Sequence, residues 1–280
     1  MEAVNKSQER TYKYMESCVF RKTKELFGGL SNMASGFPLS VNGIYVLTSE
    51  ALYQACRFPH LPDIQKKIIG EKSPMSAKMV GKPFRSDSRP DWDSVRNEIM
   101  YWCLRVKLAQ NFISFGQLLA STESKPIVED SNKDKYWGAV KDKEDESILV
   151  GVNALGRLLM KLRKEYYSEN RLDLLYVEPL NLPNFLLYHN PIQVVDERQK
   201  FLDILHRTWR IPQQTTKQTE SKSHNGISHE VSQTNIVHEP EVNHDTGNNK
   251  ETNQKPKQKS EPKSKPKTPL ATSGDLFTNI

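Results

Sequence analysis

The stretch TSEALYQACRFP, residues 48–59, places a carboxylate and other polar groups on one face of a short helix. Glu50 lies in the first turn of this helix, and Tyr53, Gln54 and Arg57 follow at helical intervals. A carboxylate in a first turn interacts favourably with the helix dipole, which would explain Glu50 without any chemistry. The alternative is that this face lines a pocket, where Glu50 could move protons or stabilise positive charge.

Two later segments repeat the combination of charged and aromatic side chains. Trp92 opens a long helical pattern, and Lys107 lies on the flank of the apolar stripe of that pattern. The loop KDKYWGAV contains Asp134, Trp137 and Gly138. A tryptophan in a charged loop is unusual, because an indole favours burial and a loop favours water. Lys107 could be a desolvated, partly neutral amine, although a lysine extended along a helix with its charge in water is the plainer interpretation.

The segment GVNALG, residues 151–156, offers an anion site at a helix start. Asn153 could cap this helix, and the small residues Ala154 and Gly156 would leave several backbone N–H groups pointing outward. Such groups bind phosphate or diphosphate, and Arg157 could add a charged partner. The pattern is weak alone, because asparagine caps and close-packed glycines are common in proteins that bind no anion.

Helices are the main elements that must position these residues. The spacing of apolar residues predicts a helix from about Ser49, two short helices divided at Ser73-Pro74, a long helix over 91–111, and a capped helix after residue 153. Asp91 or Asp93 could accept the first free N–H groups of the long helix. The expected buried stripe of the long helix comprises Val95, Ile99, Trp102, Val106 and Ala109.

Strands are expected at PIVEDSN and ILVGV, and there is neither a βαβ phosphate fingerprint nor an internal repeat. The expected fold class is therefore α+β, mainly helical, in a single compact domain. The chain has 280 residues and a formal net charge of +6, which is compatible with a polyanionic partner but does not demonstrate one. The expected organisation is a polar lead at 1–17, a domain at 18–170, an extension at 171–212 that packs on the domain, and a tail at 213–280.

The tail is rich in Lys, Pro and Gln and too poor in apolar residues to fold alone, so it is expected to be disordered and solvated. Its sharper interpretation is a tether that holds nucleic acid through phosphate contacts. No apolar run approaches the roughly 18 residues of a membrane span, which predicts a soluble, cytoplasmic protein. Cys18, Cys56 and Cys103 occur singly, so neither a disulfide framework nor a cysteine zinc site is expected.

Five blocks of the sequence, in order, resemble the NADAR family. They are FGGLSN, TSEALYQACRF, the DW…M…KLAQN segment, PIVEDSNKDKYWGA and GVNALGRLLMKLR, spread over about Phe20 to Tyr166. Members of the family are N-glycosidases that act on ADP-ribose conjugates and on riboflavin-pathway intermediates. The stretches RFPHLP, KSPMSAKM, RPDW and VEPLNLPNFLLY resemble more narrowly the branch encoded beside DarT-type DNA ADP-ribosyltransferases. In that branch the protein is the antitoxin that removes ADP-ribose from guanine in DNA.

Together, the residues and the resemblance predict a site. The predicted catalytic residues are Glu50, Asp134 and Lys107. The predicted substrate-binding residues are Asn32, Trp92, Trp137, Gly138, Asn153, Gly156 and Arg157. The chain departs from the family pattern at Leu108, where many members outside this branch have phenylalanine, and in its long tail.

Hydrolysis of an N-glycosidic bond develops positive charge on the sugar ring while the base leaves with the bonding electrons. Glu50 or Asp134 could stabilise that charge or activate water while the other protonates the leaving amine, and the sequence leaves this division open. Lys107 offers another route, in which its amine forms a Schiff base with a ring-opened ribose and Glu50 moves protons. Trp92 and Trp137 could stack on a base or on a ribose face.

The expected function is an N-glycosidase that hydrolyses the bond between ADP-ribose and guanine in ADP-ribosylated single-stranded DNA, as antitoxin to a DNA ADP-ribosyltransferase. ADP-ribose would be the product, a DarT-type toxin is a possible partner, and no cofactor, metal or membrane is required. One alternative is an N-glycosidase acting on riboflavin-pathway intermediates. Another is a non-catalytic module that binds ADP-ribosylated nucleic acid or the toxin. The combination of Glu50, Asp134 and Lys107 favours catalysis, since aromatic and backbone groups would suffice for binding.

Overall fold

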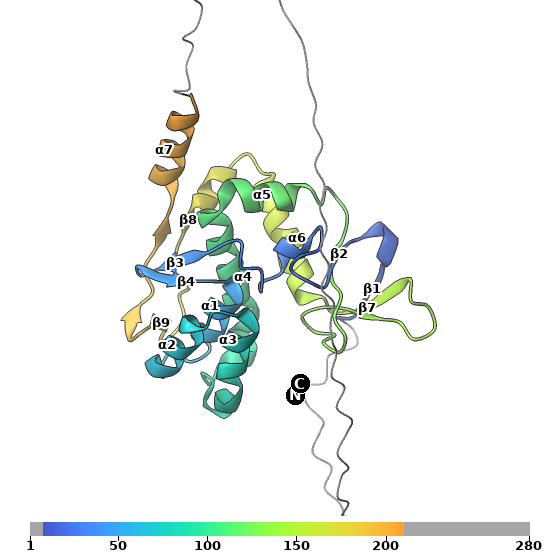
Figure 1. The fold of residues 1–280 in the computed structure, drawn as a ribbon, viewed down its shortest axis with the longest axis horizontal. Coiled ribbons are helices and arrows are strands. Elements are labelled where there is room, and N and C mark those ends of the chain that lie inside the picture. Colours follow the sequence, from blue (N-terminus) through green and yellow to red (C-terminus); the bar gives the residue numbers. More distant parts are fainter. Residues whose placement is uncertain (1–7, 210–280) are drawn as a thin grey trace, which may run out of the picture. The chain divides into compact units, whose positions relative to one another are not determined.

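The computed structural model describes residues 8–209, so the tail expected at 213–280 lies outside the described residues. Helix α4 (Trp92–Gln110) is the centre of the fold and contacts α1, α5 and α6 (Figure 1). The five residues predicted for its apolar stripe are all buried, and Ile99 and Val106 have no exposed surface at all. Helical periodicity therefore identified the core helix correctly.

Four of the other helices begin close to where the sequence predicts them: α1 (Ser49–Cys56), α2 (Pro62–Gly70), α3 (Pro74–Gly81) and α6 (Ala154–Tyr166). The structure also contains α5 (Phe112–Ala120) and α7 (Arg198–Trp209). Short 3₁₀ segments are η2 (Tyr14–Glu16), η3 (Gly28–Leu30), η4 (Lys82–Asp87) and η5 (Arg171–Leu175). Prolines at the first positions of α2 and α3 suit a helix start, because the missing N–H has no intrahelical partner there.

The strands are short and form several small sheets. They are β1 (Arg10–Lys13), β2 (Cys18–Phe20), β3 (Leu39–Val41), β4 (Ile44–Val46), β5 (Ile127–Glu129), β6 (Val140–Lys141), β7 (Ile148–Gly151), β8 (Tyr176–Val177), β9 (Leu186–Leu187), β10 (Asn190–Pro191) and β11 (Val195–Asp196). A three-stranded sheet has the order β1-β7-β6, and β2 pairs with β5 in parallel. The fold of the described residues is therefore α+β.

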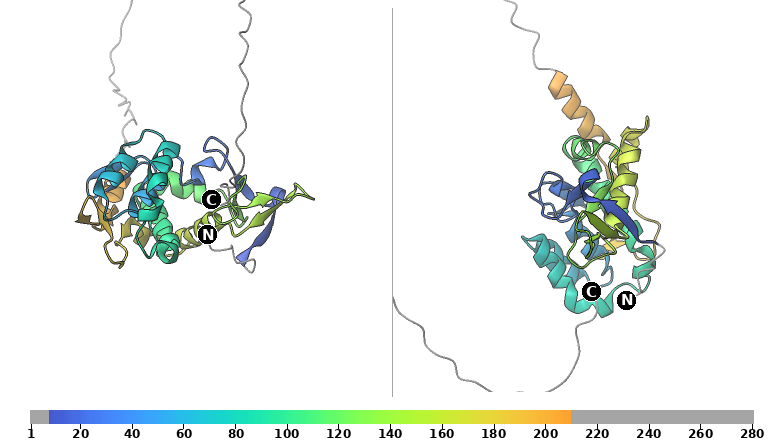
Figure 2. Two further views of the ribbon diagram at one scale, coloured as in Figure 1. Left: turned by 90° about the horizontal axis from the view of Figure 1, so that it is seen from below. Right: turned by 90° about the vertical axis from the view of Figure 1, so that its right-hand side faces the viewer.

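The lead expected at 1–17 contributes directly to this fold. Its residues 10–13 form β1, which pairs antiparallel with β7 from Arg10 opposite Gly151 to Lys13 opposite Ile148. Figure 2 shows β1 and β7 together at the side of the molecule away from α2 and α3. The polar composition of the lead reflects a mostly exposed strand, of which only Tyr12 is buried.

The capping predicted for α4 is wrong for Asp91. Asp91 occupies the N-cap position, but its side chain makes no capping hydrogen bond. Its carboxylate instead accepts two hydrogen bonds from the buried Arg89 guanidinium, at 2.5 and 2.9 Å. Arg89 also donates to the carbonyl oxygen of Pro183, at 2.8 Å. A charge pair thus competes with the cap and ties the start of α4 to the C-terminal extension.

The extension packs on the domain through α4. The Trp102 indole N–H donates to the carbonyl oxygen of Glu178 at 2.9 Å, and the Phe185 ring meets Trp102 edge-on at 5.0 Å. Strand β8 pairs with β11, and β9 pairs with β10. The three cysteines are buried and free, and none of the helices within residues 8–209 has the length and apolar character needed to cross a membrane.

Candidate active site

Helix α1 is enclosed by the domain, so its polar face points into the protein. Thr48 caps the helix, with its hydroxyl oxygen accepting from the Ala51 N–H at 3.2 Å. All eight residues of α1 are buried, and Glu50 is only 4% exposed. The helix-dipole explanation alone does not account for a carboxylate at this position, because burying an ionised group is costly unless it is paired or hydrogen-bonded.

Two amides satisfy the Glu50 carboxylate. The Asn32 side chain donates to one oxygen, and the Gln54 side chain donates to the other at 2.9 Å. The Glu50 backbone N–H in turn donates to the Asn32 carbonyl oxygen at 2.9 Å. The predicted site residue Asn32 therefore lies directly against Glu50 and holds it in one orientation.

Burial raises the pKa of Glu50, and the nearby negative charge of Asp134 adds to this effect. The Lys78 ammonium and the hydrogen bonds from Gln54 and Asn32 act in the opposite direction. Lys78 lies on α3 and was not predicted as a site residue. Glu50 is consequently a carboxyl group whose protonation is sensitive to the charges around it.

Glu129, at the end of β5, is a second perturbed carboxyl group that the sequence analysis missed. Burial, together with the negative charges of Asp134 and Glu50, raises the pKa of Glu129 to about 7. Lys78 again opposes the shift. The carboxyl groups of Glu50, Glu129 and Asp134, called here the carboxylate cluster, therefore lie within electrostatic range of one another. The only signal in the sequence is a carboxylate at the end of a strand, just before the predicted Asp134 loop.

Asp134 shapes the loop that carries the second tryptophan. One of its carboxylate oxygens accepts hydrogen bonds from the backbone N–H groups of Tyr136 and Trp137, both at 2.9 Å. This arrangement is an Asx-type turn, which fixes the loop conformation. The charge of Asp134 thus raises the pKa of Glu50 and of Glu129, and its hydrogen bond from the Trp137 N–H orients that residue.

An aromatic group formed by Trp92, Tyr53 and Trp137 lies next to the carboxylate cluster. The ring centre of Tyr53 lies 4.9 Å from that of Trp92 and 5.6 Å from that of Trp137. The Arg57 guanidinium lies 5.0 Å from the Trp92 ring centre. Tyr53 is one helical turn beyond Glu50, so α1 joins the aromatic and carboxylate groups. The two predicted tryptophans therefore converge on the same helix from different segments of the chain.

The start of α6 differs from the prediction. The backbone N–H groups of residues 152 to 155 donate to the carbonyl oxygens of residues 135 to 138, at 2.6 to 3.0 Å. The expected outward-pointing N–H groups are therefore occupied by the neighbouring loop. Arg157 is half-buried on the first turn of α6, and its binding role remains a prediction.

Asn153 and Gly156 serve this packing. Asn153 makes no side-chain cap; its amide donates to the Ile127 carbonyl oxygen at 2.8 Å and accepts from the Glu129 N–H at 3.2 Å. A Cβ atom on Gly156 would lie 2.1 Å from the Ile127 carbonyl oxygen, and one on Gly138 would lie 2.5 Å from that of Glu129. The predicted cap at Asn153 is therefore wrong, and both glycines permit close packing around β5.

Lys107 is fully buried and hydrogen-bonded. Its ammonium donates to the carbonyl oxygens of Gly29 and Ser31, at 2.7 and 2.9 Å, between the rings of Phe37 and Phe115. Burial lowers the pKa of Lys107 to about 7. The desolvated state that a nucleophilic lysine needs is therefore present, but the amine faces the 29–31 loop. In this structure Lys107 fixes the loop that presents Asn32 to Glu50.

Within residues 8–209, no three or more His, Cys, Asp or Glu side chains are grouped in a way that could hold a metal ion. The carboxylate cluster is instead defined by the electrostatic influence of its members on one another. Its members come from α1, β5 and the loop that follows β5.

One family model and several known proteins are similar to this chain. The NADAR domain model matches residues 19–166. N-glycosidase YbiA of Escherichia coli (strain K12) is 34% identical over 150 residues, which cover 54% of this chain and 88% of that protein. The chloroplastic riboflavin biosynthesis protein PYRR of Zea mays is 35% identical over 162 residues, which cover 52% of this chain and 24% of that protein. This chain therefore spans about a quarter of the maize protein.

The riboflavin biosynthesis protein VVA0006 of Vibrio vulnificus (strain YJ016) is 30% identical over 167 residues, which cover 59% of this chain and 42% of that protein. The NMR structure of the Escherichia coli protein YbiA matches with 31% sequence identity and a TM-score of 0.47, and the match covers 55% of this chain and 88% of that one.

Proposed function

The chain belongs to the NADAR domain family, and from this premise we propose that it is an N-glycosidase that releases ADP-ribose from guanine in ADP-ribosylated single-stranded DNA. The observation that carries the proposal is the buried Glu50, held by two amides beside Glu129, Asp134 and two tryptophans. A relative of 34% identity is named an N-glycosidase, which supports the reaction type. As an antitoxin, the enzyme would reverse the modification made by a DNA ADP-ribosyltransferase in the cytoplasm, with a DarT-type toxin as its partner.

In the proposed reaction, water adds its hydroxyl to the anomeric carbon of the ribose, and the bond from that carbon to the guanine nitrogen breaks. The bonding electrons leave with guanine, whose nitrogen takes up a proton. Glu129 is suited to supply this proton, because a pKa of about 7 keeps part of the population protonated at neutral pH.

Glu50 is suited to the opposite role. The Asn32 and Gln54 amides both donate to it and therefore favour its ionised form. An ionised Glu50 would stabilise the positive ring or take the proton from water. Trp92 and Trp137 would stack on guanine or on the ribose, and Asp134 would keep the Trp137 loop in place.

A second candidate function is hydrolysis of an N-glycosidic bond in a riboflavin-pathway intermediate. It is favoured by the relatives named as riboflavin biosynthesis proteins. The reaction type and the roles of Glu50 and Glu129 would be the same, and the leaving group would be a smaller heterocycle.

One experiment separates the functions. The purified full chain is incubated with single-stranded DNA that carries ADP-ribosylated guanine and, separately, with a riboflavin-pathway intermediate that contains an N-glycosidic bond. Chromatography then measures free ADP-ribose or released base, and Glu50→Gln serves as control. Release of ADP-ribose by the wild type alone is expected. Release only from the small intermediate would favour the second candidate, and tight binding of the DNA without release would indicate a binding module.

A further inference from the structure

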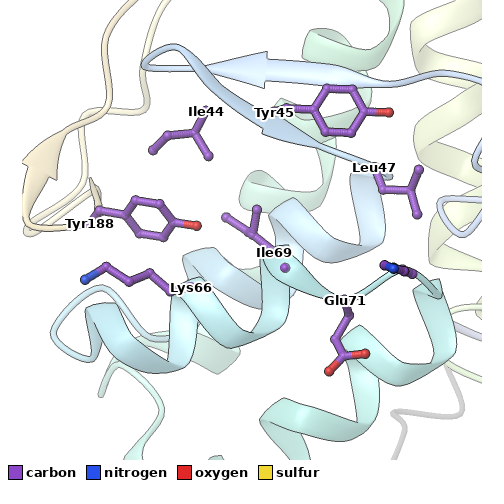
Figure 3. Close-up of a pocket in the computed structure, with 9 residues that line it drawn as sticks. Ile44, Tyr45, Leu47, Lys66, Ile69, Glu71 and Tyr188 are labelled. Atoms are coloured by element: carbon purple, nitrogen blue, oxygen red, sulfur yellow. The ribbon is translucent and has the colours of Figure 1, made fainter.

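An open cavity of about 500 Å³ lies outside the carboxylate cluster, between the β3–β4 hairpin, the end of α2 and the β9–β10 hairpin. Figure 3 shows Tyr188 extending from the β9–β10 side toward Ile69 on α2, with Ile44 and Tyr45 on the β4 side. The volume lies within the range of small-ligand sites, roughly 300–1,000 Å³. The cavity therefore combines a small apolar floor with two tyrosine rings.

The backbone at Tyr188 is strained in a way that fixes its ring. Tyr188 and the next residue, His189, have φ angles of 52° and 67° in the two-residue turn that joins Leu187 to Asn190. Such turns favour Asn-Gly, because a bulky residue in the left-handed region costs energy. A tyrosine is unusual in such a turn, and this one packs its ring partly against the hydrophobic core.

The buried side chain of Gln65 holds this turn through hydrogen bonds to the backbone. Its side-chain oxygen accepts from the Tyr188 N–H at 2.8 Å, and its amide donates to the carbonyl oxygens of Leu186 and Ala55, at 3.0 and 3.1 Å. Gln65 has no exposed surface. The Tyr188 hairpin is therefore anchored to α1 and α2 and presents its ring at a defined position.

The charges at the cavity favour an anionic ligand. Lys66 and Lys72 line it, and the Lys66 ammonium lies 6.0 Å from the Tyr188 ring centre and 3.4 Å from the Asp63 carboxylate, in an exposed ion pair. Glu71 is the carboxylate of the lining, and Figure 3 shows its side chain directed away from Tyr188 and Ile44. Tyr45 is exposed and Tyr188 is partly buried, and lysines beside aromatic rings are the usual composition of surfaces that bind single-stranded nucleic acid.

The cavity adjoins the candidate active site along the chain. Leu47, which lines the cavity, precedes Glu50 by three residues, so their Cα atoms are at most roughly 10 Å apart. The lysine side of the cavity continues through Lys72 into α3, which carries Lys78. A strand whose modified nucleotide lies at Glu50 would have a neighbouring nucleotide near Leu47, at the edge of this cavity.

We infer that this cavity is a subsite for a nucleotide of single-stranded DNA that flanks the modified guanine. The base stacks on Tyr188 or Tyr45, and Lys66 and Lys72 contact the phosphates. The assignment of the occupant as the substrate's own strand rests on the proposed function.

Binding of an unmodified single-stranded oligonucleotide to the full chain, measured by fluorescence anisotropy, tests the subsite. Tyr188→Gly removes the ring and suits the left-handed turn, and because the ring also packs partly against the core, a thermal melt is recorded to show that the fold persists. The variant should bind about tenfold more weakly, and Lys66→Gln should lower the slope of log affinity against log salt by about 1. The matched control is Tyr14→Ser. Tyr14 is an exposed tyrosine whose ring centre lies 5.8 Å from the Lys141 ammonium, and neither residue lines the cavity. Equal binding by Tyr188→Gly and Tyr14→Ser would overturn the inference.

Kinetics separate this inference from the proposed function. In Tyr188→Gly, the KM for an ADP-ribosylated oligonucleotide should rise about tenfold, and the KM for ADP-ribosylated guanosine, which lacks a flanking nucleotide, should stay unchanged. An equal rise for both substrates would overturn the subsite. Absence of hydrolysis by the wild type would refute the proposed function, and loss of oligonucleotide binding in Tyr188→Gly would still support the subsite.

Discussion

Helices α1 and α6 both follow a polar N-cap residue, Thr48 and Asn153, yet they use their first turns differently. On α1, the Glu50 carboxylate is held by two side-chain amides, and its pKa responds to Asp134 and Lys78. On α6, the backbone N–H groups at the start are bonded to loop carbonyl oxygens, and Asn153 joins β5 to the helix. The first region holds a buried carboxyl group with a shifted pKa, and the second forms a frame of backbone and amide hydrogen bonds. A helix start is a ligand site only where the surrounding chain leaves its groups available.

A substitution at Glu50 is the most direct test of the difference between the starts of α1 and α6. Glu50→Gln keeps the shape of the side chain but removes its charge and replaces one of its two accepting oxygens by an amide donor, so release of ADP-ribose from modified DNA should fall on the order of 10³-fold. Thermal unfolding should change little, because the variant no longer buries a carboxylate and a neighbouring amide can turn its oxygen toward the new N–H group. Product chromatography and a thermal melt measure both effects, and a variant with full turnover would refute the catalytic role.

Glu129 lies where the two regions meet, since its carboxyl group belongs to the carboxylate cluster and its backbone N–H donates to Asn153. If Glu129 donates the proton, kcat/KM of the wild type should fall as pH rises through about 7. Glu129→Gln should lower the rate about 10²-fold and abolish this decline. A decline that persists in the variant would assign the proton to another group, such as Lys107.

A substitution at the start of α6 should lower the stability of the protein and leave the rate of ADP-ribose release unchanged. Asn153→Ala leaves the Ile127 carbonyl oxygen and the Glu129 N–H without this partner and puts alanine at a φ of 51°. The free energy of unfolding, measured with urea, should fall by about 2–4 kcal/mol. Asn153→Gly should lose less, because glycine adopts this φ readily. A large rise in KM without loss of stability would show that Asn153 binds substrate after all.

Lys107 affects the pH dependence of stability, by a small amount at each pH step. Its pKa is about 7 in the folded protein and roughly 10.4 when unfolded. Between these values the unfolded chain binds the extra proton, so this group makes the protein more stable as pH rises from 7 to 10. The contribution is about 1 kcal/mol per pH unit. Lys107→Met should flatten this rise in urea titrations at several pH values, and an unchanged slope would contradict the buried, proton-releasing lysine.

The sequence predicted the helices well because the signals for them come from residues close together in the chain. In α4 the signal is the spacing of the apolar residues, and in α1 it is a polar start followed by apolar residues. The approach of Trp92 and Trp137 to one helix also agrees with the predicted site. Glu129 was missed because its sequence context, a strand end, is ordinary, and only its spatial neighbours distinguish it. The α6 start was misjudged for the same reason, since the carbonyl oxygens that occupy it come from a loop whose path the sequence does not reveal.

The strands after α6 set a practical limit on shortening the protein. The family match ends at residue 166, but Trp102, Arg89 and Gln65 each hydrogen-bond to backbone beyond residue 175. A fragment trimmed to the matched residues would leave three buried polar groups without these partners and uncover the apolar face that Phe185 protects. Such a fragment should be prone to aggregation, whereas one ending after β11 should retain the native fold.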